Sequence, residues 1–265
     1  MNFKKFKAYY SPWTFAVIDE FLNNKEILNL KKEILRFDKF DDKVMGNRSR
    51  INKGSSNFYK ILKESKNIKN FYKKINSARF YKKIYSLFEE EKLGWLPKAN
   101  FFKYSKDFFG EQKFSLKEIL IKQLAVMNLI KSNMNLDIDF SVSKKGYYRA
   151  PHRDRDTRVL SFLLYLNNVK KNHGGSLEIH QAKTDRYNQN HYSRFPKKKE
   201  IIKKKNILAK AGRLVIFFSS PDSYHAAEKI KKDKIKRVFI YGSYSLNRKV
   251  YWKKKNNGYK LNTIR

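Results

Sequence analysis

The sequence predicts an α+β protein in which a helical N-terminal part supports a jelly-roll-like β-barrel. Apolar residues recur at helical spacing through much of the first part of the chain, and near residue 136 the period changes to strict alternation. Short apolar stretches separated by turn residues then follow, as in β-barrels and sandwiches. We expect a single domain over 1–265, with a mainly helical flank at 1–131 and a β core at 132–250.

The composition is that of a folded protein with a large excess of positive charge. The chain is 41% hydrophobic and carries a formal net charge of +37. Such a charge is typical of proteins that bind nucleic acid, a lipid surface or a phosphorylated substrate. However, 47 of the 61 basic residues are lysines, and the abundance of Asn, Ile, Phe and Tyr indicates an AT-rich codon bias that scatters lysine over every face. A nucleic-acid partner is therefore disfavoured, and the 14 arginines are the more informative cations.

Some classes of chemistry and location are excluded by what the sequence lacks. There is no cysteine, which excludes disulfides, thiolate metal ligands and thiol nucleophiles. The N-terminus has no continuous apolar stretch of the kind found in signal peptides. No segment reaches the roughly 18 apolar residues of a membrane span. We therefore expect a soluble cytoplasmic protein.

The N-terminal part begins with a strand that leads into an amphipathic helix. Residues 13–22 predict the strand, and Asn23 or Asn24 is expected to cap the helix that follows. The apolar positions of this helix recur every three or four residues: Ile27, Leu30 and Ile34. The polar stretch 40–56 comes next and predicts a loop.

Two further regions of the N-terminal part predict helices. Residues 58–91 keep a 3.6-residue period of apolar side chains, with a break near Ser77. Ser115-x-x-Glu118 has the pattern of a capping box, in which each side chain bonds the other residue's backbone N–H. This pattern predicts one more helix over 115–131.

The β core begins with a strand in which apolar and polar residues alternate. Its apolar positions share one face: Leu136, Ile138, Phe140 and Val142. The other expected strands are short and are bounded by turn residues: 159–166, 176–180, 213–218 and 237–245. Residues 181–206 contain the run PKKKEIIKKK and predict a long basic insertion between barrel strands. Such an insertion is either a lid over a site or a surface loop.

One short motif offers the ligands of a metal ion. His152-Arg153-Asp154 is an H-x-D triplet, and residues two apart in an extended segment point to the same side. An imidazole and a carboxylate can therefore converge on one cation, with Asp156 as a weaker alternative to Asp154. The letters HRD also open the catalytic loop of protein kinases, but the chain has no D-F-G and no G-x-G-x-x-G, which excludes that reading. A solvated loop ahead of a buried strand is the alternative.

A second histidine and a later arginine extend the pattern. His225 follows the strand 213–218, and Arg237 opens the strand 237–245 on the same face as Phe239. Two imidazoles and one carboxylate with open coordination positions form the facial triad of non-haem Fe(II) oxygenases. A bidentate guanidinium suits the far carboxylate of a keto-acid co-substrate.

Linked segments from about residue 136 to 246 resemble the Fe(II)/2-oxoglutarate dioxygenase superfamily, in particular its prolyl-4-hydroxylase-like branch. The segments that carry the resemblance follow one another in the family's order: GYYRAPHRD, RVLSFLLYLN, HGGSLEIH, AGRLVIFFSSPDSYHAA and RVFIYGSY. The resemblance implies a double-stranded β-helix as the core, which agrees with the strand pattern.

The resemblance also implies the residues and cofactors of the site. His152, Asp154 and His225 would ligate Fe(II). Arg237 would hold the carboxylate of 2-oxoglutarate, with the Tyr165 hydroxyl as a second donor unless Tyr165 is only a core residue. O2 would be the other co-substrate, with ascorbate as a further candidate cofactor, and an unactivated C–H bond would be hydroxylated as succinate and CO2 are released. Hydroxylation is favoured over halogenation because halogenating relatives lack the carboxylate that Asp154 provides.

Arginines gather around the H-x-D triplet although lysine prevails elsewhere. Four of them fall within ten residues: Arg149, Arg153, Arg155 and Arg158. Recognition of an anionic substrate would explain this choice of cation, and Arg149 and Arg158 are the candidate substrate-binding residues. A solvated rim is the alternative, and Arg158 could instead brace the barrel. Arg48 and Arg50 are weaker candidates for the same role.

Two other functions share parts of this pattern. A nucleic-acid-repair oxygenase would keep the iron site and suit the charge, whereas a non-catalytic barrel that binds an anionic partner would need no metal. The expected substrate is a small molecule or a peptide residue. His173, His180 and His191 have no carboxylate at ligand spacing and are expected to be ordinary surface or turn histidines.

Overall fold

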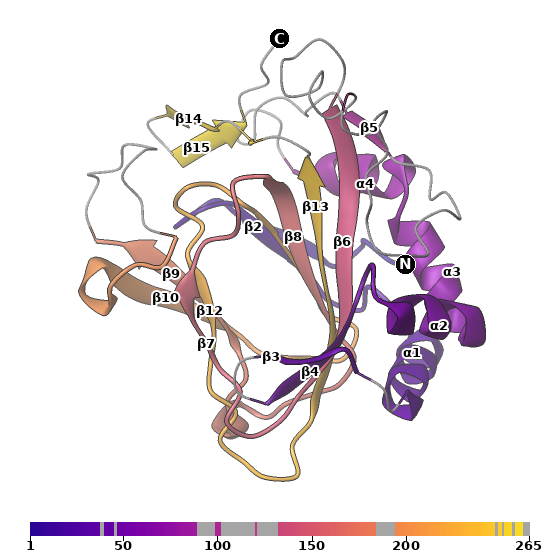
Figure 1. The fold of residues 1–265 in the computed structure, drawn as a ribbon. Helices are drawn as coiled ribbons and strands as arrows, with labels where there is room; N and C mark the ends of the chain where they lie inside the picture. Colours follow the sequence, from indigo (N-terminus) through magenta and orange to yellow (C-terminus); the bar gives the residue numbers. More distant parts are fainter. Residues whose placement is uncertain are drawn as a thin grey trace.

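Two β-sheets face each other and helices cover the outer side of the larger one (Figure 1). The computed structural model describes these residues: 1–37, 40–44, 47–88, 99–101, 120, 132–183, 194–246, 249–250, 252–255 and 258–261. The helices are α1 (Asn24–Arg36), α2 (Ser56–Glu64), α3 (Lys66–Ile75) and α4 (Ala78–Tyr85), with short 3-10 helices at Lys171–His173 and Lys198–Glu200. No helix among these residues is long and apolar enough to span a membrane.

The larger sheet combines strands from both ends of the chain. Its order is β1 (Phe6–Tyr9), β2 (Phe15–Ile18), β11 (Leu214–Phe218), β8 (Arg158–Tyr165), β13 (Arg237–Leu246), β6 (Ser132–Ser143), β4 (Arg48–Asn52) and β3 (Asp42–Val44), with β5 (Ala99–Phe101) also paired to β6. The smaller sheet has the order β10 (Ile201–Ile207), β9 (Leu177–Ala182), β12 (His225–Ala227) and β7 (Arg149–His152). A separate hairpin is formed by β14 (Trp252–Lys255) and β15 (Gly258–Leu261).

The path of the chain between the two sheets is that of a jelly roll. From β6 onward the chain crosses to the smaller sheet at β7 and returns at β8, makes the β9–β10 hairpin, and alternates again through β11, β12 and β13. Every neighbouring pair of these strands is antiparallel. The predicted α+β fold with a double-stranded β-helix core is therefore confirmed.

The two faces of the larger sheet build two separate cores. One face packs against the buried sides of the four helices, and the other faces the smaller sheet. Successive side chains of β13 point to opposite faces of the larger sheet. Val238 and Ile240 point to the helices, whereas Phe239 points into the space between the sheets. The face between the sheets is the one that can carry a site, because the other is filled by helix side chains.

The helical flank follows the predicted period with two differences. Asn23 caps α1 through a capping box with Glu26, and the break near Ser77 is confirmed, with Ser77 capping α4. A further break at Ser65 divides the long helical stretch into α2 and α3. Apart from Leu120, the helix predicted over 115–131 lies outside the described residues.

Two predictions about loops were wrong in part. The stretch 40–56 contains β3 and β4, which extend the larger sheet beyond β6. Only Ile51 is buried in β4, so this strand gives no alternation signal. The proposed insertion 181–206 contains the end of β9 and most of β10, whose lysines are exposed between the buried Ile201 and Ile207. Residues 184–193 of that stretch lie outside the described residues.

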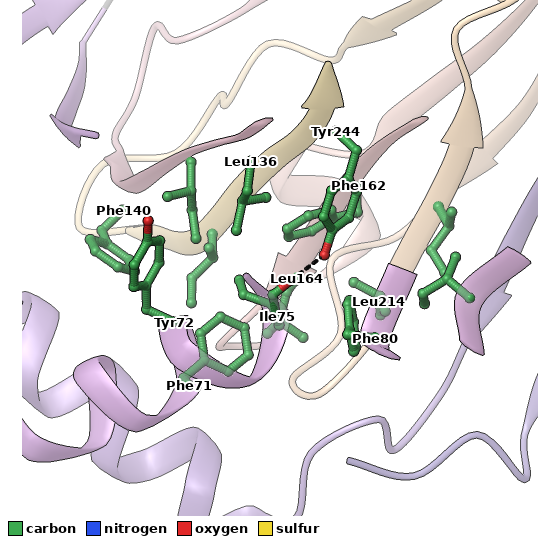
Figure 2. Packing of buried hydrophobic residues seen from close by; sticks show 14 of the residues in the cluster. Phe71, Tyr72, Ile75, Phe80, Leu136, Phe140, Phe162, Leu164, Leu214 and Tyr244 are labelled. Atoms are coloured by element: carbon green, nitrogen blue, oxygen red, sulfur yellow. Dashed lines mark hydrogen bonds between the residues drawn. The ribbon is translucent and has the colours of Figure 1, made fainter. Parts of the chain in front are cut away.

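A tyrosine joins the barrel to its helices. Figure 2 shows the hydroxyl of Tyr244, on β13, bonded to the backbone carbonyl of Ile75 at the end of α3, at 2.5 Å. Tyr244 is fully buried and its ring lies 5.1 Å from that of Tyr81 on α4. One side chain thus fills the interface and satisfies a carbonyl at a helix end.

Removing this hydroxyl is expected to loosen the helical flank. Tyr244→Phe keeps the ring but leaves the Ile75 carbonyl without its donor, which costs about 1–3 kcal/mol of unfolding free energy. Urea denaturation measures this loss. Tyr148→Phe, at a tyrosine that is 55% exposed, is the control and should leave the midpoint unchanged. Equal midpoints for both variants would contradict the bracing role.

Candidate functional site

A cavity of about 340 Å³ opens between the two sheets. Its wall combines inward-facing side chains of both sheets with the turn after β7. Its lining includes several further arginines as well as His152, Asp154, His225, Arg237, Tyr165, Phe239 and Tyr241. The predicted site residues therefore lie in one cavity.

Three potential metal ligands meet inside this cavity. His152 ends β7, Asp154 follows two residues later, and His225 begins β12. β7 and β12 are paired so that His152 and His225 stand opposite each other. One ligand atom from each of the three residues lies within 4.8 Å of the others, and all three side chains are buried. Among the described residues this is the cluster of His and acidic groups that could hold a metal ion.

Backbone contacts fix both imidazoles for metal binding. Nδ1 of His152 lies 2.8 Å from the Ala150 carbonyl, and Nδ1 of His225 lies 2.9 Å from the Ser223 carbonyl. A carbonyl can only accept, so each Nδ1 carries the proton and each Nε2 keeps its lone pair. Burial lowers the pKa of His152 to about 3 and lowers that of His225, so both rings are neutral near pH 7.

The third ligand is held as an ionised carboxylate. Arg158 donates to one oxygen of Asp154 at 2.6 Å, and Ser161 donates to the other at 2.5 Å. The Tyr241 hydroxyl lies 3.3–3.4 Å from both oxygens. Burial alone would raise the pKa of Asp154, but Arg158, His225 and the bond from Ser161 lower it well below its usual value. A charged ligand that is held this firmly is suited to a metal cation.

Arg158 and Asp156 are both paired with charged side chains near this turn. Arg158 was a candidate either for substrate binding or for bracing the barrel. Its guanidinium is paired with Asp154 and with the Tyr241 hydroxyl, so it orients a candidate metal ligand. Asp156, the weaker alternative ligand, is 48% exposed and paired with Arg153 at 2.6 Å. Asp156 lies outside the cluster and does not line the cavity, whereas Asp154 belongs to both.

Loss of Arg158 is expected to weaken metal binding rather than co-substrate binding. Arg158→Gln removes the cation that holds Asp154, and outer partners of metal ligands typically change metal affinity by about 10- to 100-fold. Anaerobic titration with Fe(II) measures the change, and Arg158→Lys should recover part of it. Arg153→Gln is the matched control, since Arg153 is paired with the exposed Asp156. Unchanged iron affinity in Arg158→Gln with an unchanged Tm would remove the positioning role.

A buried arginine stands in the wall of the same cavity. Arg237 is 3% exposed, donates from Nε to Ser143 at 3.2 Å and from Nη1 to the Gly175 carbonyl at 2.5 Å, and lies over the rings of Tyr147 and Phe239. Arg237 takes part in no ion pair between described residues. Its Nη2 atom donates no hydrogen bond to a described residue. A buried cation of this kind requires an anion to offset the loss of hydration.

The Tyr165 hydroxyl also lacks a partner. It is fully buried with no hydrogen bond to any described residue, and burial raises its pKa, so the group is a protonated donor. The charge of Arg237 acts on this hydroxyl. Two buried donors that face the same cavity can together bind a carboxylate.

Further arginines that the sequence suggested also reach the cavity. Arg48 and Arg50 come from the unexpected strand β4, where Arg48 pairs with Asp139 at 2.6 Å, and Arg149 comes from β7. Sequence reasoning missed Arg194, which bonds to the backbone of Arg153 across the turn. Arg194 follows a long stretch of sequence without a clear pattern. Only the scarcity of arginine in a lysine-rich chain could have suggested this residue.

The remaining histidines differ from the expectation in one case. His180 was expected at the surface or in a turn, but it is 6% exposed, within β9, and lies 3.1 Å from Glu178. His173 lies in a short 3-10 helix and is not part of the metal cluster. His191 lies outside the described residues.

The donor set fits a divalent iron ion. Two neutral imidazoles and one carboxylate are the facial triad of non-haem Fe(II) sites, which leaves positions for a co-substrate and O2. The imidazoles meet this requirement through the bonds of their Nδ1 atoms, and the carboxylate through its pairing with Arg158. The chain has no cysteine, so a thiolate site of the zinc or iron–sulfur type is excluded.

Comparison with known proteins finds a family model that matches part of the chain and solved structures that are similar to it. Residues 138–244 match the family model described as the 2OG-Fe(II) oxygenase superfamily, whereas no curated protein matches the chain. Similar solved structures include a prolyl-4-hydroxylase from Pseudomonas putida, with 15% identity, 87% of this chain and 91% of that chain covered, and a TM-score of 0.43. The viral collagen prolyl hydroxylase of Paramecium bursaria Chlorella virus-1, in complex with 2-oxoglutarate, has 15% identity, coverages of 87% and 94%, and a TM-score of 0.40. HygX from Streptomyces hygroscopicus, with nickel and 2-oxoglutarate bound, has 10% identity, coverages of 87% and 82%, and a TM-score of 0.44.

The family match covers the strands that carry the metal cluster, whereas β4, which also lines the cavity, lies outside it. The match extends from β6 to β13 and includes His152, Asp154, His225 and Arg237. The resemblance predicted from the sequence is thus confirmed over residues 138–244, which match the 2OG-Fe(II) oxygenase superfamily model and contain the His–Asp–His cluster.

Proposed function

We propose that the protein uses Fe(II), 2-oxoglutarate and O2 to hydroxylate an unactivated C–H bond of a small-molecule or peptide substrate. The observation that carries the proposal is the combination of two features in one cavity. A buried His–Asp–His cluster has the donor set of an iron site, and a buried arginine without a carboxylate partner among the described residues has the chemistry of a keto-acid anchor.

Each residue has a defined task in this proposal. His152 and His225 hold iron through Nε2, because their Nδ1 protons are engaged by backbone carbonyls. Asp154 supplies the third ligand as a carboxylate, which favours hydroxylation over halogenation. Arg237 and Tyr165 bind the far carboxylate of 2-oxoglutarate and so orient its keto-acid end toward the metal ligands.

The cavity itself contributes by excluding water from the reacting groups. Phe217 and Phe239 form apolar parts of its wall, and the ring of Phe217 lies 4.5 Å from that of His225. A bound iron would supply the oxygen and radical chemistry that amino-acid side chains cannot perform. The protein's part is to hold the ligands, orient the co-substrate and keep the site dry.

The test is turnover of 2-oxoglutarate by the full chain. Protein loaded anaerobically with Fe(II) should bind one iron per chain and, after O2 is admitted, release succinate and CO2 from 2-oxoglutarate. A screen of pooled metabolites and peptides should then identify substrates that increase succinate release. Metal-free protein and protein loaded with Zn(II) are the controls. Absence of iron binding would leave a non-catalytic barrel, and stimulation by oligonucleotides alone would indicate a nucleic-acid oxygenase.

A further inference from the structure

Arginine rather than lysine lines the cavity. Its described lining contains seven arginines but a single lysine, Lys53, although the chain has 47 lysines and 14 arginines. A codon bias that scatters lysine over the surface does not produce this selection. Three carboxylates lie in the same lining, so positive charge prevails there: Asp137, Asp139 and Asp154.

Three of these seven arginines already have tasks, Arg50 lies on β4, and three others lie near the metal ligands. Arg158 holds Asp154, Arg48 pairs with Asp139, and Arg237 is the proposed anchor of 2-oxoglutarate. The other three near the H-x-D turn come from separate segments of the chain: Arg149 on β7, Arg155 in the turn and Arg194 after residues 184–193.

Arg194 is fixed beside one of the metal ligands. Its backbone carbonyl accepts from the Arg153 N–H at 3.0 Å, and its Nε donates to the Arg153 carbonyl at 3.2 Å. Its guanidinium lies 5.2 Å from the centre of the Phe195 ring, and that ring stacks on His152 at 6.2 Å. A cation held in this way is available to a ligand that enters the cavity next to the His–Asp–His cluster.

Two of these arginines form no ion pair with a carboxylate in the part of the chain that the structure describes. Neither Arg155 nor Arg194 has a carboxylate within ion-pair distance among the described residues. Burial lowers the pKa of Arg194, Asp154 raises it, and Arg155, Arg158 and Arg149 lower it further. The guanidinium groups thus act on one another, which a bound anion would relieve.

We propose that Arg149, Arg155 and Arg194 bind a phosphate group of a small-molecule substrate beside the iron site. This inference rests on the proposed function, since it names the substrate class of the same cavity. A carboxylate is flat and is satisfied by one bidentate guanidinium, whereas a phosphate accepts hydrogen bonds from several directions and carries up to two charges. A volume of about 340 Å³ lies within the range of small-molecule sites, about 300–1,000 Å³.

The test measures binding of inorganic pyrophosphate and phosphate to the full chain. Calorimetry is done at constant ionic strength on protein stripped of metal, so that the anions cannot bind through a metal ion. Wild type should bind pyrophosphate, and Arg149→Gln, Arg155→Gln and Arg194→Gln should each weaken binding by about tenfold or more, because charge-assisted contacts are lost. Arg194→Lys should recover only part of the affinity, since it keeps the charge but loses the planar fork.

Control variants separate this site from its rivals. Arg79→Gln removes an exposed arginine of α4 that is not part of the cavity lining, and it should bind as wild type does. If Arg79→Gln weakens pyrophosphate binding as much as the three cavity variants do, a diffuse positive field explains the binding and the proposal is overturned. If only Arg237→Lys weakens it, the anion binds at the 2-oxoglutarate anchor, which also overturns the proposal. Single-stranded DNA that binds tightly while pyrophosphate does not would also overturn it.

The binding assay is independent of catalysis. Pyrophosphate binding without any 2-oxoglutarate turnover would support the anion site and contradict the proposed function. If the wild type turns over 2-oxoglutarate but the three variants bind pyrophosphate as tightly as the wild type does, the proposed function is supported and the anion site is contradicted. Arg155 is exposed, so Arg155→Gln keeps the test valid if the more enclosed Arg149 or Arg194 variants fail to fold.

Discussion

Replacing either candidate iron-binding histidine is expected to reduce 2-oxoglutarate turnover to background. His152→Ala and His225→Ala each remove one of three ligands, and even the outer partners of metal ligands contribute about 10- to 100-fold. Succinate release should therefore fall by more than about 100-fold, together with the iron content of anaerobically loaded protein. Full turnover in either variant would contradict the assignment.

The controls for this prediction come from the same part of the chain. Asp156→Asn changes a carboxylate that is two residues from Asp154 but is exposed and paired with Arg153. His173→Ala changes a histidine outside the cluster. Both should keep wild-type iron content and turnover. Melting temperatures measured for all variants show whether a loss of activity reflects a loss of the fold.

Asp154 is a less suitable position for the same test. Asp154→Ala would leave the guanidinium of Arg158 without its carboxylate, and a buried charge that loses its partner costs about 3–5 kcal/mol. A loss of turnover would then combine a missing ligand with a weakened barrel. Asp154→Asn keeps one oxygen that accepts from Arg158, while its NH2 group can donate to the Ser161 hydroxyl, so it is the more informative substitution.

The sequence predicted the metal cluster because local geometry determines it. An H-x-D triplet on an extended segment puts its imidazole and carboxylate on one side, and the antiparallel pairing of β7 with β12 brings His225 opposite His152. Strand alternation likewise predicted that Arg237 shares a face with Phe239, and both line the cavity. The H-x-D pair and the face of Arg237 required only the period of a strand, whereas the role of His225 as the third ligand came from the resemblance to the family.

The features that the sequence did not reveal depend on how segments are placed in the fold. Strand β4 is paired with β3 and β6 in the larger sheet and has one buried apolar residue, so its own residues carry no strand signal. Arg158 lies four residues after Asp154, and only the turn between β7 and β8 shows that it faces that carboxylate. Arg194 reaches the site through the backbone of Arg153, which no spacing in the sequence reveals.

Replacement of Arg237 is expected to raise the KM for 2-oxoglutarate more than any other change outside the metal cluster. In Arg237→Ala a bidentate, charge-assisted contact in a buried pocket is lost, which costs about 2–4 kcal/mol and corresponds to roughly a thirty- to thousandfold increase. Arg237→Lys keeps the charge but not the planar fork, so its increase should be smaller. Tyr165→Phe removes one neutral donor and should raise KM by several-fold.

The same substitutions also separate co-substrate binding from a structural role. Arg237 donates to Ser143 and to the buried Gly175 carbonyl, so Arg237→Ala should lower Tm as well, because an unsatisfied carbonyl costs about 1–3 kcal/mol. Iron affinity measured without 2-oxoglutarate should stay unchanged in a folded variant, since Arg237 contacts none of the three ligands. Lys234→Ala and Lys236→Ala remove exposed cations next to Arg237 and should leave KM as in wild type. If either lysine variant raises the KM for 2-oxoglutarate and Arg237→Ala does not, that lysine is the residue that binds the far carboxylate.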